Sequence, residues 1–177
     1  MPARIGLGLA LALLTAALPA TAQTDPTGVA NGFLAAYGTF HPSGGIPDAG
    51  GRARLSPYLS PRLNKMLAEG AAAEARFAAK VKGAPPLIEG DLFTSMFEGA
   101  TGWKPDACTV AGAAARCPVA FTHVQKGRPP VNWTDTLLMA NTPQGWRIDD
   151  IVYGGGFQFG NTGKLSDTLK LVLSQAP

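Results

Sequence analysis

The sequence predicts an α+β domain in which helices pack on one face of a curved antiparallel sheet and a further helix ends the chain. Apolar residues recur at three- and four-residue steps up to about residue 83, which indicates amphipathic helices. They alternate in steps of two from about residue 108, which indicates strands, and helical spacing returns near residue 164. Helices followed by a run of sequential strands are typical of α+β domains.

The first residues have the pattern of a secretory leader. Arg4 precedes an uncharged stretch, Ile5–Ala20, and the small residues of Ala20–Thr21–Ala22 predict cleavage after Ala22. The alternative is a membrane anchor, but the apolar stretch is short for a bilayer and contains Pro19. We therefore expect a signal peptide at residues 1–22 and one domain at 23–177, periplasmic or secreted. No cysteine lies near the junction, so no stable membrane anchor is expected after cleavage.

The amino-acid composition limits the classes of partner that this chain is expected to bind. The chain of 177 residues has 15 Lys and Arg, one of them Arg4, against 12 Asp and Glu, and the basic residues are scattered. Binding to nucleic acid needs a concentrated basic surface with phosphate contacts, so no nucleic-acid partner is expected. The length remaining after the leader is suitable for one domain with its own core.

Two helices are predicted in the first half. The first spans about Thr27 to Phe40, and the segment at 41–51, HPSGGIPDAGG, reads as a loop. Ser56 and Ser60 each precede a proline, the arrangement of a capping hydroxyl before a first helical residue. From Ser60 one apolar face continues to about Gly83.

The two cysteines pass a test of strand register. A two-residue turn at Gly112–Ala113 would pair Thr109 with Arg116 and place Cys108 directly opposite Cys117. In that non-hydrogen-bonded position the Cα atoms approach to about 4.5 Å, which a disulfide accepts. A metal-binding or redox-active pair is the alternative, but further ligands and a Cys-x-x-Cys spacing are both missing. An exported chain should therefore form a structural disulfide.

Three further segments complete the sheet and the last helix. The second strand of the cysteine hairpin should reach about residue 125, and strands at 131–140 and 146–153 should form a second hairpin around NTPQG. The terminal helix is expected at about Lys164 to Ser174. The segment PPLIEGDLFTSMFEGATGW, residues 85–103, is ambiguous between a short helix and turns.

A glycine-rich stretch between the last strand and the last helix resembles phosphate-binding loops. A P-loop would require glycine at Gln158 and Ser or Thr at Leu165, so it fails at both positions. A dinucleotide fingerprint follows the first strand of a βαβ unit, whereas this stretch lies near the end of the chain. We interpret Gly154–Gly156 as a strand end, with Phe157 and Phe159 anchoring a loop.

The adjacent aspartates Asp149 and Asp150 should point to opposite faces of their strand, so they cannot form a two-carboxylate acid–base pair. Strict alternation places Trp146, Ile148, Asp150 and Val152 on one face and Arg147, Asp149, Ile151 and Tyr153 on the other. A five-residue loop at NTPQG would put Asp135 on the face of Asp149, and a four-residue loop would put it on the face of Asp150. Either way one aspartate faces an apolar layer and needs a partner.

A polar patch at the mouth of a sheet pocket is the functional interpretation of these residues. The structural alternative is an ion-pair network in which Arg147 partners Asp149 or Asp135. His123, on an apolar strand face, is either a general base or a hydrogen-bonded core histidine. No nucleophile motif is present, and neither a metal nor a cofactor is expected. The candidate ligand-binding residues are His123, Trp133, Asp135, Arg147, Asp149 and Tyr153.

Four segments, LSPYLSPRLNKML, PPLIEGDLFTSMFEGAT, WTDTLLM and WRIDDIVYGG, carry a resemblance across most of the mature chain. Through them the chain resembles a bacterial cell-envelope family of unknown function that includes small lipoproteins. The resemblance implies a nuclear-transport-factor-2-like, or cystatin-like, cone: helices wrapped by a curved sheet around a cavity. This chain lacks the lipidation cysteine of the lipoprotein members, and the family brings no catalytic residues.

Two functional classes follow from these observations. The first is an exported, non-catalytic binding or accessory protein of the cell envelope that holds a small ligand or an envelope protein at a sheet pocket. The alternative is a cone-fold hydrolase or isomerase with Asp135, Asp149 or His123 as its base. The first is favoured because no acid–base pair is forced together by spacing. The enzyme would need His123 and an aspartate within about 3 Å of a common point in one cavity.

Overall fold

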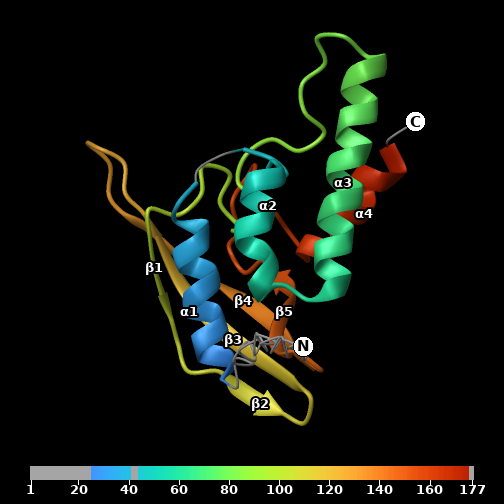
Figure 1. Cartoon of the computed structure of the whole chain (residues 1–177). Coiled ribbons are helices and arrows are strands. Elements are labelled where there is room, and N and C mark those ends of the chain that lie inside the picture. The colour runs from blue at the N-terminus through green and yellow to red at the C-terminus, as the bar shows by residue number, and fades with distance from the viewer. Residues whose placement is uncertain (1–24, 41–43, 176–177) are drawn as a thin grey trace, which may run out of the picture.

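The computed structural model describes residues 25–40 and 44–175, so the predicted leader at 1–22 lies outside the described residues. It confirms an α+β domain with helices on an antiparallel sheet and a helix at the C-terminal end (Figure 1). None of the described helices is both long and apolar enough to cross a membrane. The elements are α1 (Pro26–Tyr37), α2 (Ala49–Leu55), η1 (Ser56–Tyr58), α3 (Pro61–Lys80), β1 (Gly102–Pro105), β2 (Thr109–Ala111), β3 (Ala114–His123), β4 (Val131–Thr142), β5 (Gly145–Val152) and α4 (Leu165–Gln175).

The helix starts are set by capping side chains. The Asp25 carboxylate accepts hydrogen bonds from the backbone N–H groups of Thr27 and Gly28 at the start of α1. Ser60 Oγ accepts from Leu63 N–H at 3.0 Å at the start of α3, as the serine–proline pattern predicts. The buried face of α1, which includes Phe33 and Tyr37, contacts β1, β3 and β5. The helix therefore covers the sheet, while α3 and α4 pack side by side beyond β5 (Figure 1).

The loop predicted at 41–51 is wrong in its second part, because α2 begins at Ala49. Asp48 caps this helix by accepting a hydrogen bond from Gly51 N–H at 2.7 Å. Two glycines in the first turn weaken the helical propensity of the sequence. Leu55 at the other end is fully buried, so tertiary packing stabilises a helix that local composition does not predict.

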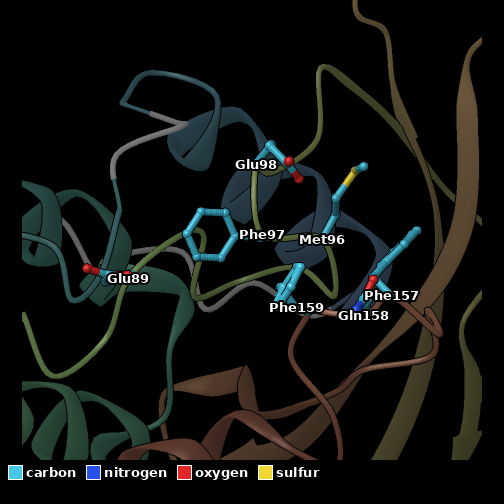
Figure 2. A pocket seen from close by; sticks show the side chains of 8 residues that line it. Glu89, Met96, Phe97, Glu98, Phe157, Gln158 and Phe159 are labelled. Carbon is cyan, nitrogen blue, oxygen red and sulfur yellow. The ribbon is translucent and has the colours of Figure 1, made fainter. Parts of the chain in front are cut away.

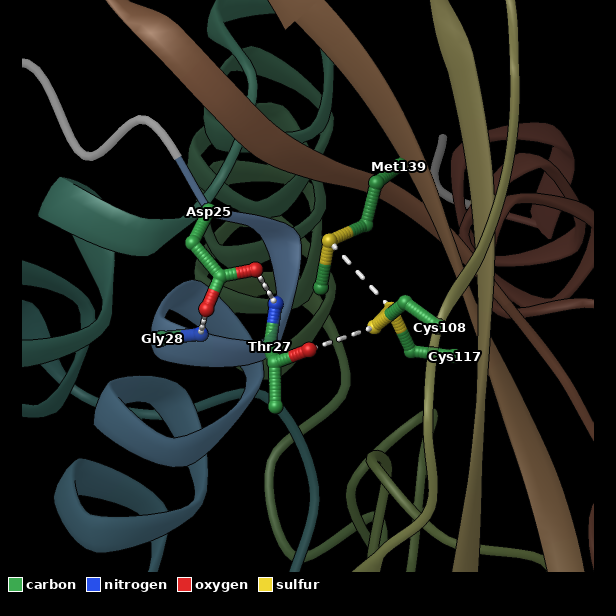
Figure 3. The surroundings of a disulfide bond; sticks show 6 residues. All are labelled: Asp25, Thr27, Gly28, Cys108, Cys117 and Met139. Atoms are coloured by element: carbon green, nitrogen blue, oxygen red, sulfur yellow. Dashed lines mark hydrogen bonds between the residues drawn. A yellow bond between two sulfur atoms is a disulfide. The ribbon is translucent and has the colours of Figure 1, made fainter.

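The cysteine hairpin has the predicted register. Thr109 pairs with Arg116 in β2 and β3, and Gly112 has the positive φ that the turn requires. Cys108 and Cys117 form a disulfide with their Cα atoms 4.2 Å apart. Figure 3 shows the disulfide against the first turn of α1, where Thr27 Oγ1 lies 3.6 Å from Cys108 Sγ. The disulfide thus crosslinks the two sides of the cysteine hairpin, next to α1, the helix that covers the sheet.

The second hairpin differs from the prediction in two ways. Thr142 pairs with Gly145, so the loop has two residues rather than four or five. Further along, Met139 pairs with Ile148 but Leu138 pairs with Asp150, which leaves Asp149 as the extra residue of a β-bulge. The bulge breaks the alternation, so Ile151 and Tyr153 are buried like Ile148 instead of sharing the face of Asp149.

Candidate functional site

The segment Asp91–Ser95 is buried although it has no regular secondary structure. Its backbone is held by long-range hydrogen bonds. Tyr153 Oη donates to the carbonyl of Leu92 at 2.7 Å, and Asn161 Nδ2 donates to the carbonyls of Asp91 and Thr94. The ambiguous segment of the sequence is therefore a fixed part of the core.

Asp135 on β4 is the centre of this buried polar region and has no solvent exposure. Its carboxylate accepts from Ser95 N–H at 2.8 Å, from Ser95 Oγ, from Trp133 Nε1 at 3.0 Å and from Gly154 N–H at 2.8 Å. A carboxylate has about four lone-pair directions, so four donors use its capacity to accept hydrogen bonds. Such saturation compensates the cost of burying the group. It leaves Asp135 in a structural position rather than that of an available base.

The glycine-rich stretch packs directly against the hydrogen-bonded residues around Asp135. Gly155 N–H donates to Ser95 Oγ at 2.9 Å. A Cβ at Gly154 would clash with the carbonyl oxygen of Thr134, and one at Gly160 would clash with the carbonyl oxygen of Ser95. The glycines permit this close approach of backbone to backbone, which explains their clustering without a phosphate.

Asp91 is a second buried carboxylate in the same segment. It accepts from Tyr37 Oη at 2.6 Å and from the N–H groups of Phe93 at 2.7 Å and Thr94 at 3.0 Å. Burial raises the pKa of Asp91 to about 6, although these hydrogen bonds oppose the shift. Burial and the neighbouring Asp91 also raise the pKa of the Tyr37 phenol.

Asp149 lies in a different environment, at the bulge and partly exposed. Arg62 on α3 binds its carboxylate through Nε and Nη2, and Ser60 Oγ donates to it at 2.6 Å. Partial burial raises the pKa of Asp149, but the hydrogen bonds from Arg62 and Ser60 outweigh it and lower the pKa overall. The expectation that Arg147 partners Asp149 or Asp135 is wrong: Arg147 instead donates to the carbonyl of Trp146.

The prediction that Asp149 and Asp150 point to opposite faces is wrong, because the bulge breaks the alternation and Arg62 Nη2 lies 2.8 Å from Asp149 Oδ2 and 3.9 Å from Asp150 Oδ2. Asp150 is the more deeply buried of the two. Its carboxylate accepts from Ser166 Oγ at 2.6 Å and from Ser166 N–H at 3.0 Å, at the first turn of α4. This attachment of β5 to the last helix gives Asp150 a structural role.

An open apolar pocket of about 540 Å³ lies above the buried network. Figure 2 shows its walls: Met96, Phe97 and Glu98 follow directly after Ser95, and Phe157 to Phe159 come from the glycine-rich stretch. Phe159 is 78% exposed and Phe97 is 40% exposed. The Phe157 ring meets the Trp133 indole edge-on, with centroids 5.4 Å apart. The expectation that Phe159 anchors the loop is wrong, because its ring faces solvent.

A second pocket, of about 350 Å³, adjoins the first and shares Met96 and Glu98 with it. Its other walls come from the end of β3 and the following loop, including His123 and Arg128. The Nδ1 atom of His123 lies 2.7 Å from the carbonyl oxygen of Gly99. A carbonyl only accepts, so Nδ1 donates there and Nε2 is the nitrogen left for other partners.

The structure brings together three of the six predicted site residues. Trp133 and Tyr153 are buried with Asp135 beneath the first pocket, where Trp133 bonds to Asp135 and Tyr153 to the backbone of Leu92. His123 lines the second pocket. Arg147 and Asp149 line neither pocket. Sequence reasoning missed the residues that do line the first pocket, and its only signal was aromatic residues in two turn-like segments.

Within the described residues, no group of three or more His, Cys, Asp or Glu side chains is placed to hold a metal ion. The described arrangement offers an apolar surface with a few polar groups at its rim, which is suited to holding a ligand. Comparison with known proteins finds no matching family model, curated protein or solved structure.

Proposed function

We propose that this chain is an exported binding or accessory protein of the bacterial cell envelope, and that its ligand occupies the pocket between Met96–Glu98 and Phe157–Phe159. The observation that carries the proposal is the exposure of two phenylalanine rings, Phe97 and Phe159, on one concave surface. Exposed apolar side chains that gather in a pocket, rather than being scattered, are typical of binding sites.

The rigid base of the pocket supports the same proposal. Ser95, directly before Met96, is hydrogen-bonded to Asp135 and to Gly155 N–H, so both walls are tied to one carboxylate. A preformed site loses less conformational entropy when a ligand binds than a mobile one does. The buried polar residues therefore act in binding by positioning the walls rather than by touching the ligand.

Two features of the chain support export. The leader pattern ends at Ala22, and Cys108 and Cys117 form a disulfide, a bond that persists in oxidising compartments. Cell fractionation followed by N-terminal sequencing tests this part. A periplasmic or secreted protein that begins at Gln23 is expected, and a cytosolic protein that retains Arg4 would contradict it.

A hydrolase or isomerase is the second candidate, and one observation favours it: His123 and Glu98 line the same pocket. The acid differs from the aspartates predicted from sequence, since Asp135 is saturated beneath the surface and Asp149 is paired with Arg62. Turnover of a panel of chromogenic esters by the wild type, abolished by His123→Gln, would support this candidate over simple binding.

Binding is tested with an environment-sensitive apolar dye. The wild-type protein should enhance its fluorescence saturably, and Phe159→Ser should weaken binding about tenfold, the effect of removing a large apolar contact. Leu171→Ser is the matched control, because Leu171 is also an exposed apolar residue but lies on α4, outside both pockets. Equal affinity in all three proteins would contradict the proposed site.

A further inference from the structure

The pocket carries a charge pattern that narrows the chemistry of its ligand. Glu89 and Glu98 are the charged residues in the lining of the first pocket, and Met96, Phe97, Phe157 and Phe159 give it apolar walls. Figure 2 shows Glu89 and Glu98 on either side of the Phe97 ring. A ligand with an apolar group between the rings and a positive charge beside it would satisfy both features.

The two pockets together indicate an extended ligand. They share Met96 and Glu98, so a molecule that fills the first pocket and continues past Met96 enters the second. The second pocket has Pro129 and Pro130 in its wall, and the partly exposed Val131 continues its apolar surface. A polypeptide segment, with side chains at intervals along a narrow backbone, fits two adjoining open pockets better than a single compact ligand does.

A second copy of this chain is a poorer match for the surface. In a twofold dimer the same patch meets itself, which would bring the glutamates of one protomer toward those of the other. Like charges that face each other in an interface oppose association. The charge pattern therefore favours a different, cationic partner.

We infer that the joined pockets bind an extended peptide segment in which an apolar residue is flanked by Lys or Arg. The apolar side chain occupies the space between Phe97 and Phe159, and the basic neighbour pairs with Glu98 or Glu89. Arg128 lines only the second pocket, where it repels positive charge, whereas Glu89 lines only the first pocket, so the charges favour the basic residues of the peptide in the first pocket. This inference rests on the proposed binding function and names its ligand class.

Three short synthetic peptides test the inference by fluorescence anisotropy on the full mature protein: leucine alternating with lysine, leucine alternating with glutamate, and serine alternating with lysine. The leucine–lysine peptide should bind, and the other two should bind at least about tenfold more weakly. A single-chain alkylammonium amphiphile is the small-molecule arm. Should the amphiphile displace the apolar dye as well as the leucine–lysine peptide does, the commitment to a peptide is overturned.

Substitutions then test which charged residues of the pockets interact with the basic residues of the peptide. Glu98→Gln should weaken the leucine–lysine peptide about two- to fivefold, the effect of one exposed ion pair, and this loss should shrink at high salt. Glu69→Gln, on α3 and outside both pockets, is the matched control and should have no effect. Arg128→Gln should leave binding unchanged or strengthen it, so weaker binding would contradict the inferred orientation.

The outcomes separate this inference from the proposed function. If the leucine–glutamate peptide binds as tightly as the leucine–lysine peptide, the pocket is a binding site but the cationic ligand class is wrong. If neither peptide binds and the dye also fails to bind, the proposed function fails as well.

Discussion

Two adjacent segments of the chain differ in which of their side chains are buried. Asp91–Ser95 buries two hydroxyl groups and a carboxylate, while Met96–Glu98, which follows directly, exposes much of the Phe97 ring. The same contrast recurs near the end of β5, where Gly154 bonds to buried Asp135 and Phe159 is 78% exposed. In each pair, buried polar groups lie next to an exposed phenylalanine ring.

This contrast has an energetic meaning. Burial of a carboxylate is costly unless donors surround it, and burial of a phenylalanine ring gains about 1.5–3 kcal/mol that an exposed ring forgoes. In this fold four donors surround the buried carboxylate of Asp135, which offsets the cost of its burial. The ring of Phe159 stays exposed, so the free energy that its burial would contribute is not realised. Polar residues inside therefore serve as a scaffold, and aromatic residues outside remain available for a partner.

The largest effect is expected at the centre of the scaffold. Asp135→Asn places an amide N–H₂ group among backbone and indole donors, so the free energy of unfolding should fall by about 3–5 kcal/mol. Asp149→Asn is the matched control at a partly exposed site, where the cost should stay near or below about 1 kcal/mol. Urea unfolding measures both, and equal losses would show that burial of Asp135 is not what distinguishes the two.

Asp91 should give the scaffold a pH dependence. Its pKa is raised in the folded state from 3.8 to about 6, so the folded protein holds this proton over a range in which the unfolded chain has lost it. The resulting stabilisation is complete below about pH 4 and is lost as the pH rises through about 6, a change of at most about 3 kcal/mol. Asp149, whose pKa is lowered, acts in the opposite direction and at lower pH, since its stabilisation is lost as the pH falls through that lowered pKa.

The comparison that isolates Asp91 is Asp91→Asn against the wild type between pH 4.5 and 7. The amide oxygen can accept from Phe93 and Thr94 as before, and the amide nitrogen can donate to Tyr37 Oη. The variant should fold and should lack the decline in unfolding free energy that the wild type shows. A decline of the same size in both proteins would assign the dependence to another group.

A smaller effect is expected where the glycine-rich stretch meets the scaffold. Gly154→Ala introduces a Cβ against the carbonyl oxygen of Thr134, so thermal unfolding should show a loss of about 2 kcal/mol. Gly156→Ala meets nothing within 4 Å and should be neutral or slightly stabilising. If both variants match the wild type, close backbone approach is not the reason for glycine at position 154.

Features with a local cause could be predicted from the sequence. The turn at Gly112 fixes the register that joins Cys108 to Cys117, and the serine–proline pair at Ser60 begins α3, because each depends on neighbouring residues alone. The last helix also falls where its periodicity predicts, at Leu165–Gln175.

Features that depend on distant partners could not be predicted. The bulge at Asp149 is accompanied by Arg62, which is 87 residues away, and one inserted residue reverses the faces of Ile151 and Tyr153. The pocket joins a segment near residue 97 to one near residue 158, and no periodicity connects them. Asp135 was expected to need a partner, but its donors come from separate elements and could not be named.

Two serines allow the most direct test of the claim that the buried scaffold positions the binding pocket. Ser95 Oγ joins Asp135 to Gly155 N–H, and Ser60 Oγ joins Asp149 to Leu63 N–H, so each bridges an aspartate and a backbone donor. Both Ser95→Ala and Ser60→Ala should lose about 1–2 kcal/mol of stability.

The decisive measurement is the affinity of the apolar dye for these two variants under conditions where both are fully folded. Only the bridge at Ser95 lies between the two walls of the pocket. If the buried scaffold positions the pocket, Ser95→Ala should weaken binding several-fold while Ser60→Ala binds like the wild type. Unchanged binding in Ser95→Ala, or the same loss in both variants, would contradict this claim.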